Sequence, residues 1–203
     1  MKLLLIRHGE SMGNATGNYS IATSDSLSQK GKEQALATVP FLQSQSFEKI
    51  IVSPLSRAQE TIAPYLKAEE TQAEIWPEIS EACWHEEKEP ICNAWKTEAI
   101  EIATELKSFF TFKNDEAVRP LGDEPYGEGL KRVHSFVEYI KASSKKSDGT
   151  FLMVSHGHFI REFLKMLFET SNTVGFHQDN CGATLLSYNG DWTMEYSNRP
   201  IMS

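Results

Sequence analysis

Two histidines and two arginines lie in the polar segments that follow three short apolar runs, and their side chains could bind a phosphate or another anion. The four residues are Arg7, His8, Arg57 and His156, and the runs are residues 3–6, 50–52 and 151–154. In an open parallel sheet, ligands bind beyond the carboxyl ends of the strands. If the runs are strands, these cationic and hydrogen-bond-donating groups converge at one edge, where an anion would neutralise them.

The setting of Arg57 strengthens this expectation. Ser56 is predicted to cap a helix, with Gln59 completing a capping box, which places Arg57 in the first helical turn. The helix dipole disfavours a cation there, and a bound anion would resolve the conflict. His156 precedes another helix start, and Gly157 would let the backbone approach a ligand closely.

The elements that must position these residues can be read from the apolar pattern. The three runs are short and do not alternate, which is typical of parallel strands buried on both faces. Apolar residues at helical spacing predict helices within residues 28–42, 94–112, 130–141 and 159–168, and Pro40 should end or kink the first. Asn189-Gly190 predicts the turn of a hairpin. Strands alternating with helices predict a three-layer α/β/α sandwich with a mostly parallel central sheet.

Residues 77–126 interrupt this alternation, because they show no strong strand pattern and prolines punctuate both ends. We interpret them as a helical cap insertion that lies over the sheet edge. The whole chain, residues 1–203, is then a single domain, as its length suggests.

The composition excludes several classes of function. The net charge is -8 and the pI is about 5.3, which argues against a nucleic-acid binder and against docking on an anionic membrane. Three cysteines are too few for a disulfide framework, and no apolar run has the length of a signal peptide core or a membrane span. We expect a cytoplasmic protein. Its oligomeric state stays open.

Several segments together resemble the histidine phosphatase superfamily, the phosphoglycerate mutase-like proteins. They occur in the family's order across nearly the whole chain, and they are residues 5–11 with Asn14, 27–35, 53–61, 154–157 and 180–182. The Arg-His-Gly triplet alone would be a weak signal, whereas the ordered set is specific.

This resemblance implies roles for the site residues. His8 would attack phosphorus and form a phosphohistidine, which water or another acceptor then discharges. Arg7, Arg57 and His156 would hold the phosphoryl oxygens, with Asn14 and Gly157 adding neutral contacts. The positive charge comes from side chains, so we expect no metal and no other cofactor. The partner would be a small phosphorylated substrate.

The leaving group also needs a proton donor, and the resemblance points to Glu81. The match is loose there, and Glu78, Glu86 and Glu87 remain alternatives. The absence of a tryptophan near Asn14, the short chain and an excess of acids between residues 78 and 105 favour a phosphatase over a cofactor-dependent phosphoglycerate mutase-type phosphotransferase.

Two other classes are weaker alternatives. In a metal-dependent hydrolase, His156, His158 and His8 could ligate the ion, but two neighbouring guanidinium groups would repel it. In a non-catalytic phosphate-binding module, the full set of catalytic residue types would have no purpose.

Overall fold

The computed structural model describes residues 1–19, 25–82, 97–113, 117–120, 124–171 and 173–201. Its centre is a seven-stranded sheet with the strand order β5-β3-β2-β7-β1-β8-β9. The strands are β1 (Lys2–Arg7), β2 (Lys49–Val52), β3 (Ala73–Ile75), β5 (Phe110–Phe112), β7 (Thr150–Ser155), β8 (Gly182–Tyr188) and β9 (Trp192–Pro200). The first five in that order run parallel, and β8 and β9 form the predicted antiparallel hairpin.

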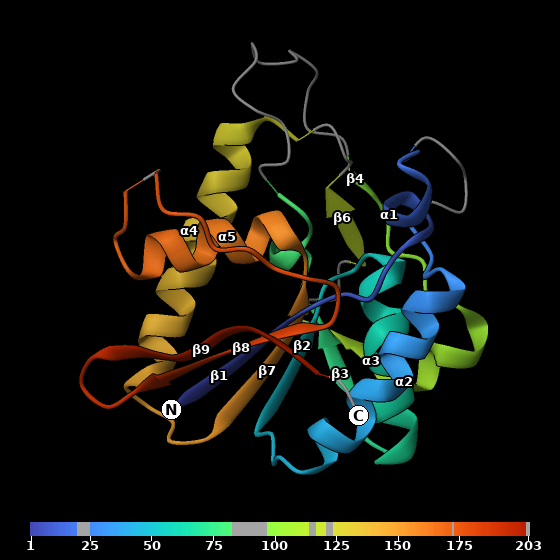
Figure 1. The fold of residues 1–203 in the computed structure, drawn as a ribbon, viewed down its shortest axis with the longest axis horizontal. Coiled ribbons are helices and arrows are strands. Elements are labelled where there is room, and N and C mark those ends of the chain that lie inside the picture. The colour runs from blue at the N-terminus through green and yellow to red at the C-terminus, as the bar shows by residue number, and fades with distance from the viewer. Residues whose placement is uncertain (20–24, 83–96, 114–116, 121–123, 172, 202–203) are drawn as a thin grey trace.

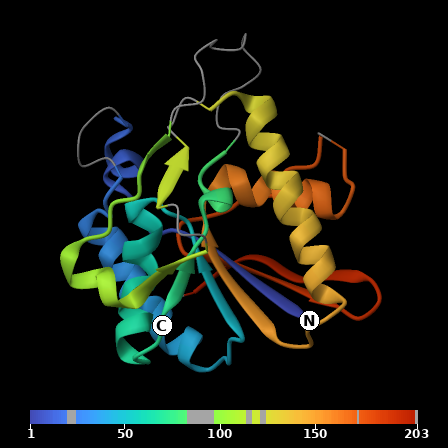
Figure 2. The same ribbon diagram turned by 180° about the vertical axis from the view of Figure 1, so that it is seen from behind.

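Helices cover both faces of this sheet, as Figures 1 and 2 show from opposite sides. On one face lie α4 (Tyr126–Ser144) and α5 (Gly157–Leu167), packed over Leu3, Leu5, Ile51 and Met153. On the other lie α2 (Gln29–Gln43) and α3 (Ser56–Ala68), packed over the alternate residues of the same strands. Because the central strands are buried on both sides, their sequences are continuously apolar. The predicted three-layer sandwich is confirmed.

The strand order places the polar motifs side by side. Strand β7 lies between β2 and β1, with Val154 paired to Val52 and to Ile6. Their carboxyl ends therefore meet at the centre of one sheet edge. The short helix α1 (Met12–Thr16) lies at the same end of the molecule (Figure 1).

The helix predicted at residues 94–112 is wrong for the part that the structure describes. Residues Thr97–Ala99 form strand β4, which pairs antiparallel with β6 (Val118–Pro120), and Phe110–Phe112 form β5 at the edge of the main sheet. Between them lies only a 3-10 helix, η2 (Thr104–Phe109). Ile100, Leu106 and Phe110 are buried as expected, but from a residue after β4, from η2 and from β5 and not from one α-helix. Residues 94–96 lie outside the described part.

Two local predictions also need correction. Helix α2 continues through Pro40 to Gln43, so the first of the two effects predicted for this proline, an end to the helix, is wrong. Helix α3 begins at Ser56, and its N-cap is Leu55 without a side-chain hydrogen bond, so the predicted Ser56–Gln59 capping box does not form. Gln59 is buried instead and donates to the carbonyl of Pro54. Among the described residues, no helix has the length and apolar character needed to cross a membrane.

Candidate active site

The two predicted histidines lie together at the sheet edge. His8 follows β1 and His156 precedes α5, and their ring centroids are 5.1 Å apart. Both side chains are almost completely removed from solvent, at 2% and 0% exposure. The convergence that the sequence predicted is therefore present.

The hydrogen bonds of His8 fix the roles of its two ring nitrogens. Nδ1 lies 2.6 Å from the carbonyl oxygen of Gly9, which can only accept, so Nδ1 carries the proton. Nε2 accepts from Nε of Arg57 at 3.1 Å. The lone pair of His8 therefore lies on Nε2, on the side of the ring that faces Arg57.

Burial keeps both imidazoles neutral. Desolvation lowers the pKa of His8 well below its ordinary value, and the neighbouring Arg57 lowers it further. The pKa of His156 is also lowered well below the ordinary value, first by desolvation and then by Arg57 and His8. A neutral His8 has a nucleophilic lone pair at neutral pH.

Two buried donors in this cluster have no hydrogen-bond partner among the described residues. One is Nε of Arg7, whose Nη1 donates to the carbonyl of Gln178 at 2.7 Å. The other is Nδ1 of His156. Its Nε2 lies 2.6 Å from Oγ of Ser53, which already accepts from the N–H of Leu55; when the Ser53 hydroxyl donates to Nε2, the ring proton lies on Nδ1. Leaving a buried polar group unsatisfied costs about 1–3 kcal/mol. Such groups at the end of a sheet are typical of a site that binds a polar ligand.

Asp25 is a site residue that the sequence reasoning missed. Its carboxylate forms an ion pair with Nη1 of Arg57 and accepts a hydrogen bond from the backbone N–H of Ser56 at 2.8 Å. Asp25 therefore caps α3 and holds Arg57 at the same time. The anion expected from the unfavourable position of Arg57 exists, and within the protein it is a carboxylate.

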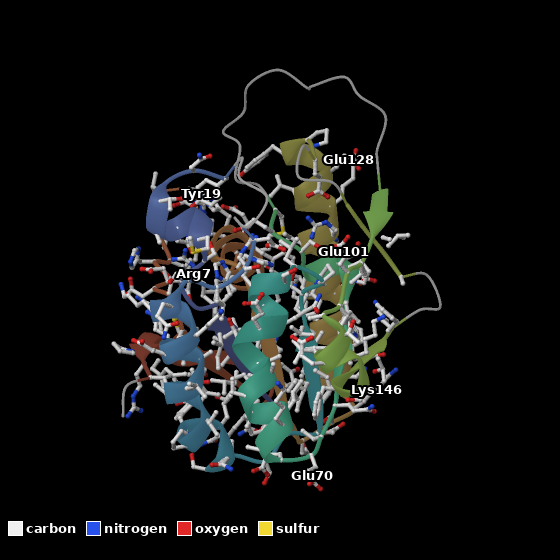
Figure 3. The ribbon with its side chains drawn as sticks, turned by 90° about the vertical axis from the view of Figure 1, so that its right-hand side faces the viewer. Arg7, Tyr19, Glu70, Glu101, Glu128 and Lys146 are labelled. Carbon is white, nitrogen blue, oxygen red and sulfur yellow. The ribbon has the colours of Figure 1, made fainter. Side chains whose placement is uncertain are left out.

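Asn14 lies next to the histidine pair rather than on it. It completes a capping box with Ser11 at the start of α1, and its Nδ2 donates to the hydroxyl of Tyr19 at 3.0 Å. Asn180 bridges the two regions, since its Nδ2 lies 3.0 Å from the carbonyl of His8 and 3.3 Å from Oδ1 of Asn14. Figure 3 shows Arg7 and Tyr19 toward the same end of the molecule, away from Glu70.

Gly157 lies against Arg7, because a Cβ placed on it would be 3.4 Å from Nε of the arginine. A larger side chain there would press on the guanidinium. This contact gives Gly157 a place at the site, next to the unpartnered nitrogen.

Glu81 reaches the site from the segment that follows 3-10 helix η1 (Pro77–Ile79). Its Oε1 accepts from the backbone N–H of Phe159 in the first turn of α5, at 3.1 Å, and from Ala82 at 3.2 Å. Its charge raises the pKa of Arg7, against the larger effect of burial. Among the alternatives, Glu78 forms an ion pair with Lys113 at 2.6 Å, and Glu86 and Glu87 lie outside the described residues.

The described part of the chain contains no group of three or more histidine, cysteine, aspartate and glutamate side chains that could hold a metal ion. The ligand set considered above, His8 with His156 and His158, is therefore not assembled.

Comparison with known proteins adds independent information. The family model described as histidine phosphatase superfamily (branch 1) matches residues 3–199. The adenosylcobalamin/alpha-ribazole phosphatase of Salmonella typhi is 28% identical over 159 residues, which are 77% of this chain and 74% of that protein. Its Escherichia coli counterpart is 38% identical over 81 residues, 40% of each chain.

Solved structures share the fold along the whole chain. The alpha-ribazole phosphatase from Shigella flexneri has a TM-score of 0.71 at 24% identity and covers 100% of this chain and 98% of that one. The phosphoserine phosphatase from Entamoeba histolytica has a TM-score of 0.65 at 22% identity, with 97% and 96% coverage.

Proposed function

Since the chain belongs to the histidine phosphatase superfamily, and the similar proteins reported above are named phosphatases, we propose that it is a metal-independent phosphomonoester hydrolase with Nε2 of His8 as its nucleophile. The observation that carries the proposal is the hydrogen bonding of His8. Its Nδ1 proton is held by the Gly9 carbonyl, which leaves the lone pair on Nε2. In the structure this lone pair accepts the Nε–H of Arg57. An arriving phosphoryl oxygen would have to take over that N–H, which frees Nε2 to attack and makes Arg57 a donor to the substrate.

In the first step, Nε2 of His8 attacks phosphorus, the N–P bond forms and the ester P–O bond breaks. The phosphoryl oxygens carry negative charge during this step, and hydrogen-bond donors stabilise it. The unpartnered Nε of Arg7 and Nδ1 of His156 can supply them, together with Arg57. With this much positive charge and donor capacity from side chains, the step needs no metal.

The departing oxygen takes a proton, and we assign Glu81 as the donor. The described hydrogen bonds of its carboxylate both go to Oε1, so the proton would lie on Oε2. In the second step, water attacks the phosphohistidine, the N–P bond breaks and Glu81 recovers a proton from the water. Inorganic phosphate is released and His8 returns to its starting state.

Within the segment 77–126, interpreted above as a cap, the part around β4 and β6 would supply the side of the site that meets the alcohol part of the substrate, since β5 belongs to the main sheet. Strands β4 and β6 lie beyond the carboxyl end of the sheet, which is consistent with this (Figure 1). The names of the similar proteins suggest the first substrates to test besides aryl phosphates, namely alpha-ribazole phosphate and phosphoserine.

Trapping the intermediate tests the proposal. Protein quenched rapidly during turnover should carry an acid-labile, base-stable phosphate on His8. His8→Asn should abolish both the labelling and the hydrolysis. His177→Asn is the matched control, because that histidine is 79% exposed and lies outside the cluster. Undiminished hydrolysis by His8→Asn would refute the assignment of the nucleophile.

A further inference from the structure

Arg132 in α4 is a buried cation that binds the backbone of the segment leading to Glu81. Its Nη1 donates to the carbonyls of Glu78 at 2.6 Å and Ser80 at 2.9 Å, and its Nη2 donates to the carbonyl of Glu81 at 3.0 Å. Three nearby carbonyls are thus fixed by one side chain. Sequence reasoning gave Arg132 no role.

The remaining donors of Arg132 are used by Glu124. Nε and Nη2 bind the two carboxylate oxygens at 2.8 and 2.5 Å, and the side chains are only 8% and 6% exposed. Every N–H of the guanidinium therefore has an acceptor, and none is left for a phosphoryl oxygen. Arg132 lies close enough to lower the pKa of His156, but all of its N–H groups bind Glu124 and the carbonyls of Glu78, Ser80 and Glu81. We call this set of contacts the clamp.

The clamped segment connects directly to the reacting groups. Ser155, the residue before His156, donates from Oγ to the carbonyl of Ile79 at 2.8 Å. The side chain of Glu81 then reaches the first turn of α5. The backbone is therefore fixed on both sides of the turn that presents Glu81, by α4 and by the end of β7.

We infer that Arg132 is a positioning residue for proton donation by Glu81, an inference that rests on the role proposed for Glu81 above. A planar guanidinium can bind three carbonyls and a carboxylate together, whereas a lysine ammonium is a compact point charge that cannot. When the clamp is weakened, the backbone at Glu81 can move, and the carboxyl group loses its alignment with the leaving oxygen. Small misplacements of a catalytic group can cost about 100-fold in rate.

The dependence of the rate on the leaving group separates this role from general stability. Dinitrophenolate departs without a proton, whereas phenolate needs one. In Arg132→Lys, kcat/KM for phenyl phosphate should fall about 100-fold, while kcat/KM for dinitrophenyl phosphate should fall less than about 3-fold. Glu81→Gln should show the same selectivity, and the double variant should lose little more than Glu81→Gln alone.

Val137→Ala is the matched control, since Val137 is buried in the same helix but contributes only to the core. It should lower thermal stability and reduce the rates of both substrates by the same factor. If Arg132→Lys also behaves in this way, or folds too poorly to assay, Glu124→Gln provides a second perturbation of the same contacts, one that keeps the guanidinium and its three carbonyl acceptors. Equal losses for both substrates in every folded clamp variant, with a selective loss in Glu81→Gln, would overturn the positioning role alone. No selective loss in Glu81→Gln would overturn the proton-donor role first, and the positioning role with it.

Discussion

Protonation of the buried histidines should make the stability of this protein strongly dependent on pH. In the folded state, burial and Arg57 hold the pKa values of His8 and His156 well below the ordinary value of 6.5. In the unfolded state both rings titrate near that value. As the pH falls below about 6.5, the unfolded chain therefore takes up two protons that the folded protein does not, and folding becomes less favourable.

The size of the effect follows from the number of groups. Below the pKa of the unfolded histidines, each such group contributes a slope of up to about 1.4 kcal/mol per pH unit to the free energy of unfolding, so the pair contributes up to about 2.8 kcal/mol per unit. Burial also lowers the pKa of His158, which adds to the slope in the same direction. Burial raises the pKa of Glu60, so protonation of Glu60 changes the unfolding free energy in the direction opposite to that of the histidines. Measurements are therefore best kept between about pH 5 and 6.5.

Urea unfolding at several pH values measures this slope. His8→Asn should reduce it by about 1.4 kcal/mol per unit, because one buried group no longer titrates. An unfolding free energy that stays constant from pH 6.5 to 5 would refute the reasoning. It would mean that the two histidines accept protons as easily in the fold as in water, and that His8 is not held neutral.

Two further predictions concern the phosphoryl site and the acceptor. Arg57→Ala should reduce kcat by about 100- to 1,000-fold, because a donor to the phosphoryl group is lost. The unfolding free energy should change by no more than about 1 kcal/mol, because Asp25 still caps α3. If calorimetry shows a large loss of stability while the assay shows retained activity, Arg57 is a structural residue. With 3-phosphoglycerate and a trace of 2,3-bisphosphoglycerate, phosphate release should exceed formation of 2-phosphoglycerate, and isomerisation faster than release would make the protein a mutase.

The sequence predicted the sheet, and the position of His8 and His156 side by side at its edge, because both depend on local pattern. The strands that contain Leu5, Ile51 and Met153 are buried on both faces, so their apolar runs are easily recognised in the sequence. The order of these strands in the sheet then places the motifs at their ends next to one another. The prediction of a helix at 94–112 failed because apolar residues at helical spacing can also be buried by a strand and a 3-10 helix. Pairing of Phe110–Phe112 with β3 decided the outcome.

Asp25, Ser53 and Arg132 could not be assigned in the same way. Each acts on a partner far away in the sequence, as Asp25 does on Arg57 and Arg132 does on the carbonyl of Glu81. A single polar residue has no periodicity that would reveal such a contact. The only available signal was the unfavourable position of Arg57, which correctly indicated an anion but not that the protein itself supplies one.

The position of these carboxylates changes how the substrate must be held. The sequence suggested that the N-termini of α3 and α5 would bind the phosphoryl group, but Asp25 occupies the first of them and Glu81 accepts from Phe159 at the second. An incoming phosphate would have to displace a carboxyl group to take the same donors. Nε of Arg7 and Nδ1 of His156 lie near the second of these helix ends, but among the described residues neither carboxylate binds them. The phosphoryl group should therefore be bound chiefly by side chains around His8, with the two helix ends serving to fix Arg57 and Glu81 in place.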